Sequence, residues 1–425
     1  MNIAFISYEY PPDTALGGIA TYVAQAARML VQRGHHVEVF AAGDRSVRTV
    51  EAGIVVHRVV TPQRSDFSKA IAPIFAARHR QTQFDVLEAT DIDAPARDAV
   101  QLVPDIALVV KLHTPTFLMQ EISEIKPSLS QKLRWHLGTL RRGQPPRPYP
   151  RFHYAPSTDI ERFQALDADI IAAPSIAIGE VLKSRWQLNA DTFSLVPLPY
   201  LPAPELLAIP ANTQTNTITF LGRLEIRKGV LDLAKAVPLI LRQCPNAKFR
   251  FVGSAWNSPH RDLDMRQYLE RQLYRYHHAL EFTGKVSLAE IPSFLEKTDI
   301  CVFPSLWESF GLVCLEAMAA ARGVVGSSAG GMAEILQGEV GRLVPPTSPE
   351  QIAAAVVELL QNPALRMQLG QAARDRVLTE YSLERIGRMQ EDSYIQAIQR
   401  RRAIDSRSKQ VDSQVIHSQV ISRWL

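Results

Sequence analysis

Two glutamates, Glu308 and Glu316, stand on either side of the start of a predicted helix. A buried strand over residues 299–305 leads into a turn, and the helix is expected to begin near Phe310. A helix start binds phosphate, because its unpaired N–H groups and the positive end of its dipole point the same way. Glu308 would lie at the mouth of this site, and Glu316, two turns in, would share its face. Carboxylates accept hydrogen bonds from sugar hydroxyls, so the segment predicts a nucleotide-sugar site. The alternative is an amphipathic helix whose glutamates face water.

Two further signals follow predicted strands in the first half of the chain. Ligands of open α/β sheets bind beyond the carboxyl ends of the strands. Gly17 and Gly18 follow the first strand, where glycine lets the backbone approach a ligand and lead into a helix. A plain tight turn explains this pair equally well. His113 ends another strand, where it can contact a sugar, although a lone histidine is more often structural.

The second half of the chain places cations after its first strand. Arg223 and Lys228 lie in the loop Gly-Arg-Leu-Glu-Ile-Arg-Lys-Gly over residues 222–229. The planar fork of an arginine grips phosphate oxygens and a lysine adds a point charge, which suits a diphosphate. A solvated basic loop is the alternative interpretation.

A second glycine pair, Gly330 and Gly331 followed by Glu334, lies between another strand and helix. Each of these signals is modest by itself. Together they place phosphate donors and sugar acceptors at strand ends that would share one cleft, which favours a single nucleotide-sugar site.

Length and composition indicate a globular protein of two domains. The 425 residues exceed one ordinary core. An apolar share of 46% with 21% charged residues is typical of folded proteins rather than disordered ones. The 47 basic and 43 acidic residues leave a net charge of only +4, so we expect no nucleic-acid partner.

Cysteine usage and the N-terminal sequence predict a cytoplasmic protein. The three cysteines have neither CxxC nor Cys/His spacing, which argues against a disulfide framework and a structural zinc site. The N-terminus lacks a basic region and meets prolines before a signal-peptide core could form. Because no apolar run reaches the length of a bilayer, we expect at most a peripheral contact with the inner membrane face.

Strand and helix signals alternate in two series. The first series has a helix over 19–32 and strands over 2–7, 36–41, 54–59, 84–88, 106–113 and 169–173. The second has strands over 217–221, 249–252, 280–284, 300–304 and 324–327. Such alternation indicates parallel, doubly wound sheets. The Pro- and Ala-rich stretch over 198–212 is expected to link two Rossmann-like domains.

Taken in order, the motifs resemble the retaining glycosyltransferases of family 4. The motifs are Gly17-Gly18 with Gly34-His-His-Val, Gly222-Arg-Leu with Lys228-Gly, Glu308-x-Phe-Gly-x-x-x-x-Glu316, Gly330-Gly-x-x-Glu334, and Gly341-Arg-Leu-Val-Pro-Pro. The likeness extends from the first strand to about Ile398. Ser309 stands where the family usually has glycine, which bears on the choice of sugar.

The resemblance implies an α/β GT-B fold, in which two Rossmann-like doubly wound domains face a cleft. Residues 1–200 would form the acceptor domain and residues 213–383 the nucleotide-sugar domain. A helix over 384–400 would cross back to the N-terminal domain, and a polar tail would follow over 401–425.

The resemblance also implies roles for the motif residues. Arg223 and Lys228 would hold the donor diphosphate, and Glu316 would bind the ribose. The donor-binding residues would be Gly18, Arg223, Lys228, Glu308, Phe310, Gly311, Leu312 and Glu316. The acceptor would meet Gly17, Gly18 and His113, and the catalytic residues would be Glu308, His113, Arg223 and Lys228. No metal or other cofactor is expected, since cations and helix ends supply the charge that Mg²⁺ supplies elsewhere.

The implied activity is retaining transfer of a hexose from a nucleoside diphosphate sugar to a hydroxyl of a sugar or lipid-linked acceptor. Polysaccharide or glycolipid synthesis would use such a reaction. Front-face attack is the favoured mechanism, with Glu308 assigned to binding and charge stabilisation. The alternatives are a nucleotide-sugar epimerase of the same architecture, which needs no acceptor, and a non-catalytic sugar-nucleotide binding protein.

Residues 116–162 form a basic and aromatic segment that the motifs do not cover. The basic residues are Lys126, Lys132, Arg134, Arg141, Arg142, Arg147 and Arg151, and the aromatic ones are Trp135, Tyr149, Phe152 and Tyr154. The prolines over 145–150 predict a loop. Three interpretations stay open: a solvated lid, acceptor recognition through stacking and phosphate or uronate contacts, or attachment to an anionic membrane.

Overall fold

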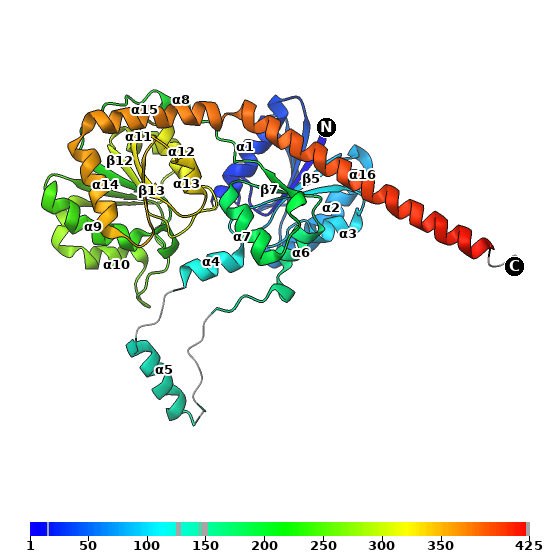
Figure 1. Cartoon of the computed structure of the whole chain (residues 1–425), viewed down its shortest axis with the longest axis horizontal. Helices are drawn as coiled ribbons and strands as arrows, with labels where there is room; N and C mark the ends of the chain where they lie inside the picture. The colour runs from blue at the N-terminus through cyan, green and yellow to red at the C-terminus, as the bar shows by residue number, and fades with distance from the viewer. Residues whose placement is uncertain (15–16, 125–128, 144, 146–151, 422–425) are drawn as a thin grey trace.

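The computed structural model describes residues 1–14, 17–124, 129–143, 145 and 152–421. These residues form two α/β domains that lie side by side, with one long helix crossing from the second to the first (Figure 1). The two sheets and their helices confirm the two Rossmann-like, doubly wound domains expected from the sequence.

The N-terminal sheet has eight strands in the order β3-β4-β2-β1-β5-β6-β7-β8. Its strands are β1 Asn2–Ser7, β2 His36–Ala42, β3 Val47–Glu51, β4 Ile54–Val59, β5 Val86–Thr90, β6 Ala107–Lys111, β7 Ile170–Ala173 and β8 Phe193–Leu195. Its helices are α1 Gly18–Gln32, α2 Phe67–Thr82, α3 Arg97–Leu102, α4 Thr116–Ser123, α5 Leu129–Arg141, α6 Ile160–Asp167 and α7 Ile176–Trp186. All pairings are parallel except that of β3 with β4. Continuous apolar runs form the central strands because helices cover both faces of a parallel sheet.

The C-terminal sheet has six parallel strands in the order β11-β10-β9-β12-β13-β14. Its strands are β9 Thr217–Leu221, β10 Lys248–Val252, β11 Leu280–Gly284, β12 Ile300–Phe303, β13 Gly323–Ser327 and β14 Arg342–Val344. Its helices are α8 Pro204–Leu207, α9 Val230–Gln243, α10 Met265–Gln272, α11 Ile291–Glu296, α12 Leu312–Ala319, α13 Gly331–Ile335, α14 Pro349–Gln361 and α15 Pro363–Glu380. The short 3₁₀ turns are η1 Arg64–Asp66, η2 Pro156–Thr158, η3 Ala190–Thr192, η4 Ile226–Lys228, η5 Tyr274–Ala279 and η6 Leu288–Glu290.

The strand order reverses beside β1 in the first sheet and beside β9 in the second. At such a switch point the connections leave on opposite faces and open a crevice beyond the strand ends. The loops that follow β1, β6, β9, β12 and β13 carry the predicted site residues. The fold therefore gathers these loops at the carboxyl ends of the strands of the two sheets.

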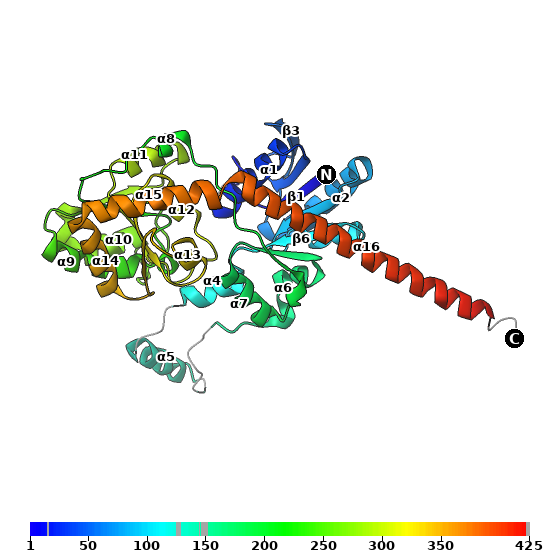
Figure 2. The same ribbon diagram turned by 45° about the horizontal axis from the view of Figure 1, so that its top comes forward.

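The final helix, α16, runs from Leu383 to Ile421 and crosses back over the N-terminal domain in both views (Figures 1 and 2). Its expected end at residue 400 was wrong, and residues 401–421, expected as a tail, continue the helix. The sequence has neither proline nor glycine after Gly387 to stop it. Residues 422–425 lie outside the described part of the chain.

A buried polar cluster fixes α16 to the N-terminal sheet. Glu88 on β5 accepts hydrogen bonds from Gln390 Nε2 at 2.9 Å and from the Tyr394 hydroxyl at 2.7 Å. The hydroxyl of Tyr22 on α1 donates to the other carboxylate oxygen. Burial raises the pKa of Tyr22 well above its ordinary value. Since a buried carboxylate needs such donors, α16 completes the N-terminal domain.

Candidate active site

The centre of the site is a contact between Lys228 and Glu308. Glu308 follows β12, is 6% exposed, and accepts a hydrogen bond from Lys228 Nζ through Oε1. Ser305 Oγ donates to the same oxygen at 3.0 Å. Burial acts to raise the pKa of Glu308, but the charges of Lys228 and Arg227 outweigh it, so the pKa is lowered. Glu308 is therefore held as a carboxylate, beside a lysine that the sequence placed in the same site.

A glycine makes this contact possible. Gly229 follows η4 with a φ of 69°, and a Cβ there would meet the Pro304 carbonyl oxygen at 1.8 Å. The turn that carries Lys228 can therefore pack directly on the end of β12 only without a side chain at this position. The close approach brings Lys228 and Glu308 together although 80 positions separate them.

Arg227 belongs to the same cluster and was missed in the sequence. Its Nη2 donates to Glu225 Oε1 at 2.8 Å, and its Nη1 lies 3.6 Å from Glu308 Oε1. Arginine and lysine are adjacent in the motif, but only the geometry of the 3₁₀ turn shows that both approach one carboxylate. Arg227 is buried, and its positive charge adds to that of Lys228 in lowering the pKa of Glu308.

Arg223 lies nearer to solvent than these residues. Its side chain is 34% exposed, its Nη2 is 3.3 Å from Glu225 Oε1, and its guanidinium lies 4.6 Å from the Trp256 ring centre. Stacking on the indole leaves part of the guanidinium edge open. Arg223 can therefore meet an anion that enters the cleft.

Helix α12 begins at Leu312, two residues after the expected start near Phe310. Gly311 precedes it with a φ of 117°. The Phe310 ring is buried and packs edge-on against Tyr381, with 5.6 Å between ring centres. The Phe310 side chain is thus not available to a ligand, and a donor contact through the backbone of Phe310 and Gly311 stays a prediction.

Glu316 lies on the second turn of α12. Burial raises the pKa of its carboxyl group to about 7. Within the described part of the chain, no group hydrogen-bonds to this carboxyl group. Burial raises the pKa of the nearby Tyr200 well above its ordinary value, and the charge of Glu316 raises it further. A carboxyl group in this state can accept donors from a ligand.

On the facing domain, His113 follows β6 and is held by Asp91. Its Nδ1 lies 3.1 Å from Asp91 Oδ1 and 3.2 Å from the Lys111 carbonyl oxygen. Both neighbours are acceptors, so Nδ1 carries the proton and Nε2 is left as an acceptor. Nε2 is buried without a hydrogen-bond partner in the described structure, which leaves it available to a hydroxyl.

Sequence reasoning missed both Asp91 and Glu161, which shape this wall. Asp91 accepts the His113 N–H through both oxygens at 3.0 Å. Glu161 accepts from the backbone N–H of Asp93 at 3.0 Å and of Thr116 at 2.8 Å. Burial, aided by the charge of Asp91, raises the pKa of Glu161 to about 7. β5 ends at Thr90 rather than at residue 88, so Asp91 was not recognised as a strand-end residue.

The two walls meet through direct contacts. Thr114 Oγ1 donates to Ser309 Oγ at 3.2 Å, and Ser175 Oγ donates to the Ser309 carbonyl at 2.6 Å. Gly18 lies against Leu312, since a Cβ on Gly18 would be 3.9 Å from Leu312 Cδ1. His113 directly precedes Thr114 in the sequence, and Glu308 directly precedes Ser309. The structure thus brings Gly18 and the neighbours of His113 and Glu308 to one interface between the domains.

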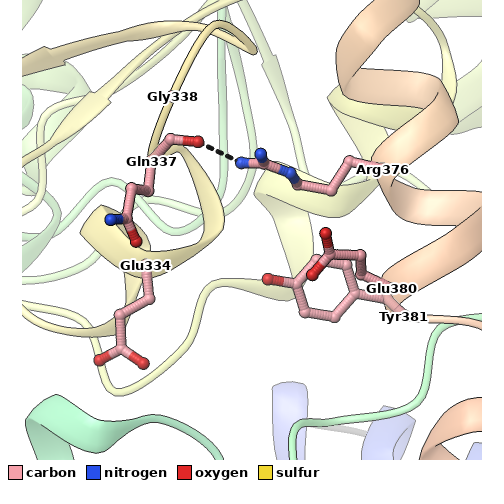
Figure 3. Close-up of a pocket in the computed structure, with 6 residues that line it drawn as sticks. All are labelled: Glu334, Gln337, Gly338, Arg376, Glu380 and Tyr381. Carbon is pink, nitrogen blue, oxygen red and sulfur yellow. Dashed lines mark hydrogen bonds between the residues drawn. The ribbon is translucent and has the colours of Figure 1, made fainter.

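Glu334 has a position that the sequence did not indicate. Its carboxylate accepts from the backbone N–H groups of Ile176 at 2.9 Å and Ala177 at 2.8 Å. These groups begin α7 of the other domain, where the helix dipole favours a negative charge. Glu334 also borders a separate cavity of about 280 Å³, lined by Glu334, Gln337, Gly338, Arg376, Glu380 and Tyr381 (Figure 3). Glu334 therefore joins the domains rather than the donor site.

The described residues show neither a metal-binding cluster nor a membrane-spanning helix. They contain no group of three or more His, Cys, Asp or Glu side chains arranged to hold a metal ion. They also contain no helix with both the length and the apolar character needed to cross a bilayer. Metal independence stays a prediction.

Comparison with known families matches both domains in turn. Residues 16–200 match the model described as Glycosyltransferase Family 4, and residues 215–362 match Glycosyl transferases group 1. A phosphatidyl-myo-inositol mannosyltransferase of Mycobacterium tuberculosis is 28% identical over 372 residues, which cover 82% of this chain and 85% of that protein. An uncharacterized glycosyltransferase of Methanocaldococcus jannaschii is 38% identical over 174 residues, which cover 40% of this chain and 42% of that protein.

Solved structures share the fold across both domains. Sucrose-phosphate synthase from Thermosynechococcus elongatus superposes with a TM-score of 0.69 at 23% identity, covering 93% of this chain and 98% of that one. Anabaena HepE in complex with UDP has a TM-score of 0.64 at 18% identity, covering 92% and 99%. These likenesses confirm the GT-B architecture.

Proposed function

The chain belongs to the glycosyltransferases of family 4, and from that premise we propose that it moves a hexose from a nucleoside diphosphate sugar to a hydroxyl acceptor with retention. The observation that carries the proposal is the Lys228–Glu308 contact beside the start of α12. It combines a cation for a leaving phosphate with a carboxylate for a sugar. Solved structures of HepE with UDP-glucose support a donor of this class.

The diphosphate is assigned to Arg223, Lys228 and the backbone before α12. Negative charge on the leaving diphosphate grows as the glycosidic bond breaks, so these groups stabilise the transition state more than the ground state. Arg223 is accessible at the rim, whereas Lys228 must share its protons between Glu308 and the phosphate. The same cations make a metal ion unnecessary in this proposal.

The nucleoside and the sugar are assigned to the two motif glutamates. Glu316 has a raised pKa and an unpartnered carboxyl group, which two ribose hydroxyls can satisfy. Glu308 is ionised, and it accepts hydrogen bonds from hydroxyls of the donor sugar. The His113 Nε2 acceptor faces hydroxyls from the opposite wall.

In the reaction, the acceptor oxygen attacks the anomeric carbon from the side that the diphosphate leaves. The bond from this carbon to the phosphate oxygen breaks, the bond to the acceptor oxygen forms, and the acceptor proton passes to the leaving phosphate. Attack and departure on one face retain the configuration. Glu308 stabilises the positive charge that develops on the sugar.

A lipid-linked or polymeric acceptor is proposed, in polysaccharide or glycolipid synthesis on the cytoplasmic side. The name of the mannosyltransferase relative, which specifies a phosphatidyl-inositol acceptor, supports the lipid-linked form. Gly17 and Gly18 are exposed, and Gly18 lies next to α12, which leaves backbone for an acceptor at this side of the cleft.

The test is release of nucleoside diphosphate from UDP-, GDP- and ADP-sugars, with and without a panel of acceptors. Transfer predicts acceptor-dependent release and a product with the donor's anomeric configuration by NMR. Equal turnover without acceptor would instead identify an epimerase. Binding of the sugar nucleotide without any turnover would identify a binding protein, and an inverted product would overturn retention.

A further inference from the structure

Helix α5 presents an apolar stripe that neither domain covers. It lies apart from both domains in two views (Figures 1 and 2). Leu133, Leu137 and Leu140 are spaced four and three positions apart, so they share one helix face. Their exposed fractions are 62%, 49% and 57%. Three neighbouring exposed leucines form an apolar surface, and covering this surface with an apolar environment lowers the free energy.

The charge around this stripe has one sign. Arg134 and Arg141 are exposed on α5, and Arg142 is exposed in the turn that follows it. From position 126 to position 158 the sequence holds seven basic residues and no acidic one. The whole chain has a net charge of only +4, so the seven positive charges of this segment exceed the net charge of the chain. At about 100° per residue, Arg134 and Arg141 lie on the same side of the leucine stripe.

One aromatic residue of the segment, Tyr154, is already engaged by the N-terminal domain. The Tyr154 ring stacks on Phe117 with 4.1 Å between ring centres, and its hydroxyl donates to Asp159 at 2.7 Å. Tyr154 therefore packs against the core of the N-terminal domain and is not free to stack on a sugar. Tyr149, Lys126, Arg147, Arg151 and the loop predicted over 145–150, apart from residue 145, lie outside the described residues.

The position of the segment in the chain relates it to the cleft. Helix α4 begins at Thr116, three residues after His113, and Thr116 donates to Glu161 through its side chain at 2.6 Å. α4 also contacts η4, which carries Lys228. The chain that carries α5 thus starts from the wall assigned to the acceptor.

We propose that α5 lies in the plane of an anionic lipid bilayer. Leu133, Leu137 and Leu140 enter the boundary between headgroups and acyl chains, as the apolar face of an interfacial helix does. Arg134 and Arg141 contact lipid phosphates, whose negative surface potential attracts basic side chains. This attachment goes beyond the proposed transfer reaction and does not depend on it. It would hold the acceptor wall against the surface where a lipid-linked acceptor is displayed.

Flotation with vesicles tests the proposal on the full chain, without any nucleotide sugar. Vesicles of phosphatidylcholine alone are compared with vesicles that also contain phosphatidylglycerol. We expect the wild-type protein to bind the anionic vesicles at least about tenfold more tightly, and added salt to weaken that binding. Equal or absent binding to both vesicle types overturns the proposal.

Matched variants identify the helix as the cause. The triple change Leu133→Ser, Leu137→Ser and Leu140→Ser should lower anionic-vesicle binding by about tenfold or more, as should Arg134→Gln, Arg141→Gln and Arg142→Gln. The controls change exposed residues elsewhere, namely Leu102, Leu288 and Leu378 to Ser, and Arg48, Arg80 and Arg275 to Gln. Vesicle binding that survives both α5 triples overturns the proposal.

Two other occupants of the stripe give different results. A second copy of the chain would produce a concentration-dependent dimer in light scattering that the leucine triple abolishes. A soluble acidic polysaccharide would bind the wild-type protein in place of vesicles and would require the arginines but not the leucines. Either result, without vesicle binding, overturns the bilayer assignment. Loss of transferase activity alone would leave the flotation result unchanged, so the two proposals fail separately.

Discussion

Lys228 Nζ donates a hydrogen bond to Glu308 Oε1, and the two residues come from loops that follow neighbouring strands of the C-terminal sheet, β9 and β12. Removing either charge leaves the other in a low-dielectric site without this partner. Such a pair stabilises the fold less by its attraction than by the penalty for breaking it. We therefore expect its members to act as a unit in stability and, in the proposed reaction, in catalysis.

Replacing Arg223 or Lys228 by alanine should lower turnover by on the order of 10²-fold or more, because both oppose charge on the leaving diphosphate. Only Lys228→Ala should also lower stability, by roughly 1–3 kcal/mol, since it strips a charged hydrogen bond from buried Glu308. Turnover and thermal unfolding of both variants check this. Turnover close to wild type in both would remove these residues from the catalytic set.

Glu308→Gln and Glu316→Ala should separate rate from affinity. Glu308 faces the reacting sugar, so its amide should lower kcat while the affinity for free nucleoside diphosphate stays near normal. Glu316 contacts are made equally in ground and transition states, so its loss should mainly weaken nucleotide binding. Calorimetric titration with the diphosphate measures both. Lost affinity in the Glu308 variant would reverse the two roles.

Nucleotide binding should release a proton near pH 7. The pKa of Glu316 is about 7 because burial disfavours its charged form, and hydrogen bonds from ribose hydroxyls would favour that form and lower the pKa. The observed heat should then be more exothermic in Tris than in phosphate buffer. Glu316→Gln is the control, because any difference that remains comes from the diphosphate itself. An equal buffer effect in both proteins would contradict the ribose contact.

Glu334→Ala should favour separation of the domains. A carboxylate at a helix start contributes about 0.3–2 kcal/mol, so the equilibrium constant for the closed form should fall by about 2- to 30-fold. Small-angle X-ray scattering of the donor-free protein would report a larger radius of gyration. Glu339→Ala, an exposed change just after α13, is the matched control. Identical scattering from both variants would show that Glu334 does not hold the domains.

Turnover should continue in excess EDTA, since Arg223, Lys228 and the start of α12 oppose the diphosphate charge in place of a metal ion. The assay compares initial rates before and after chelation. A complete loss that Mg²⁺ or Mn²⁺ restores would contradict the proposed charge balance.

The sequence was most informative where burial dictates residue type. β1, β4, β9 and β11 were predicted to the residue. β1, β4 and β9 are buried strands that read as apolar runs, whereas β11 is a partly exposed edge strand. β3 was missed because it is an exposed, antiparallel edge strand with almost no apolar run. Periodicity along one strand carries no signal for such an edge.

The site was predictable in its residue types but not in its partners. The spaced glutamates and the loop cations pointed to one cleft, and the structure joins Glu308 to Lys228. Arg227, Asp91 and Glu161 were missed because their importance lies in which buried group they contact. The Glu334 contact with α7 could not be predicted, since it depends on how two separately folded domains meet.

The crossing of α16 has a consequence for synthesis on the ribosome. Glu88 is made early, but Gln390 and Tyr394, which satisfy it, are made about three hundred residues later. At about 5–20 residues per second, this delay is roughly 15–60 s. During that time the Glu88 carboxylate of the nascent N-terminal domain lacks two of its donors, and the surface that α16 will cover is open to solvent. The first domain to leave the ribosome is thus the last to be completed.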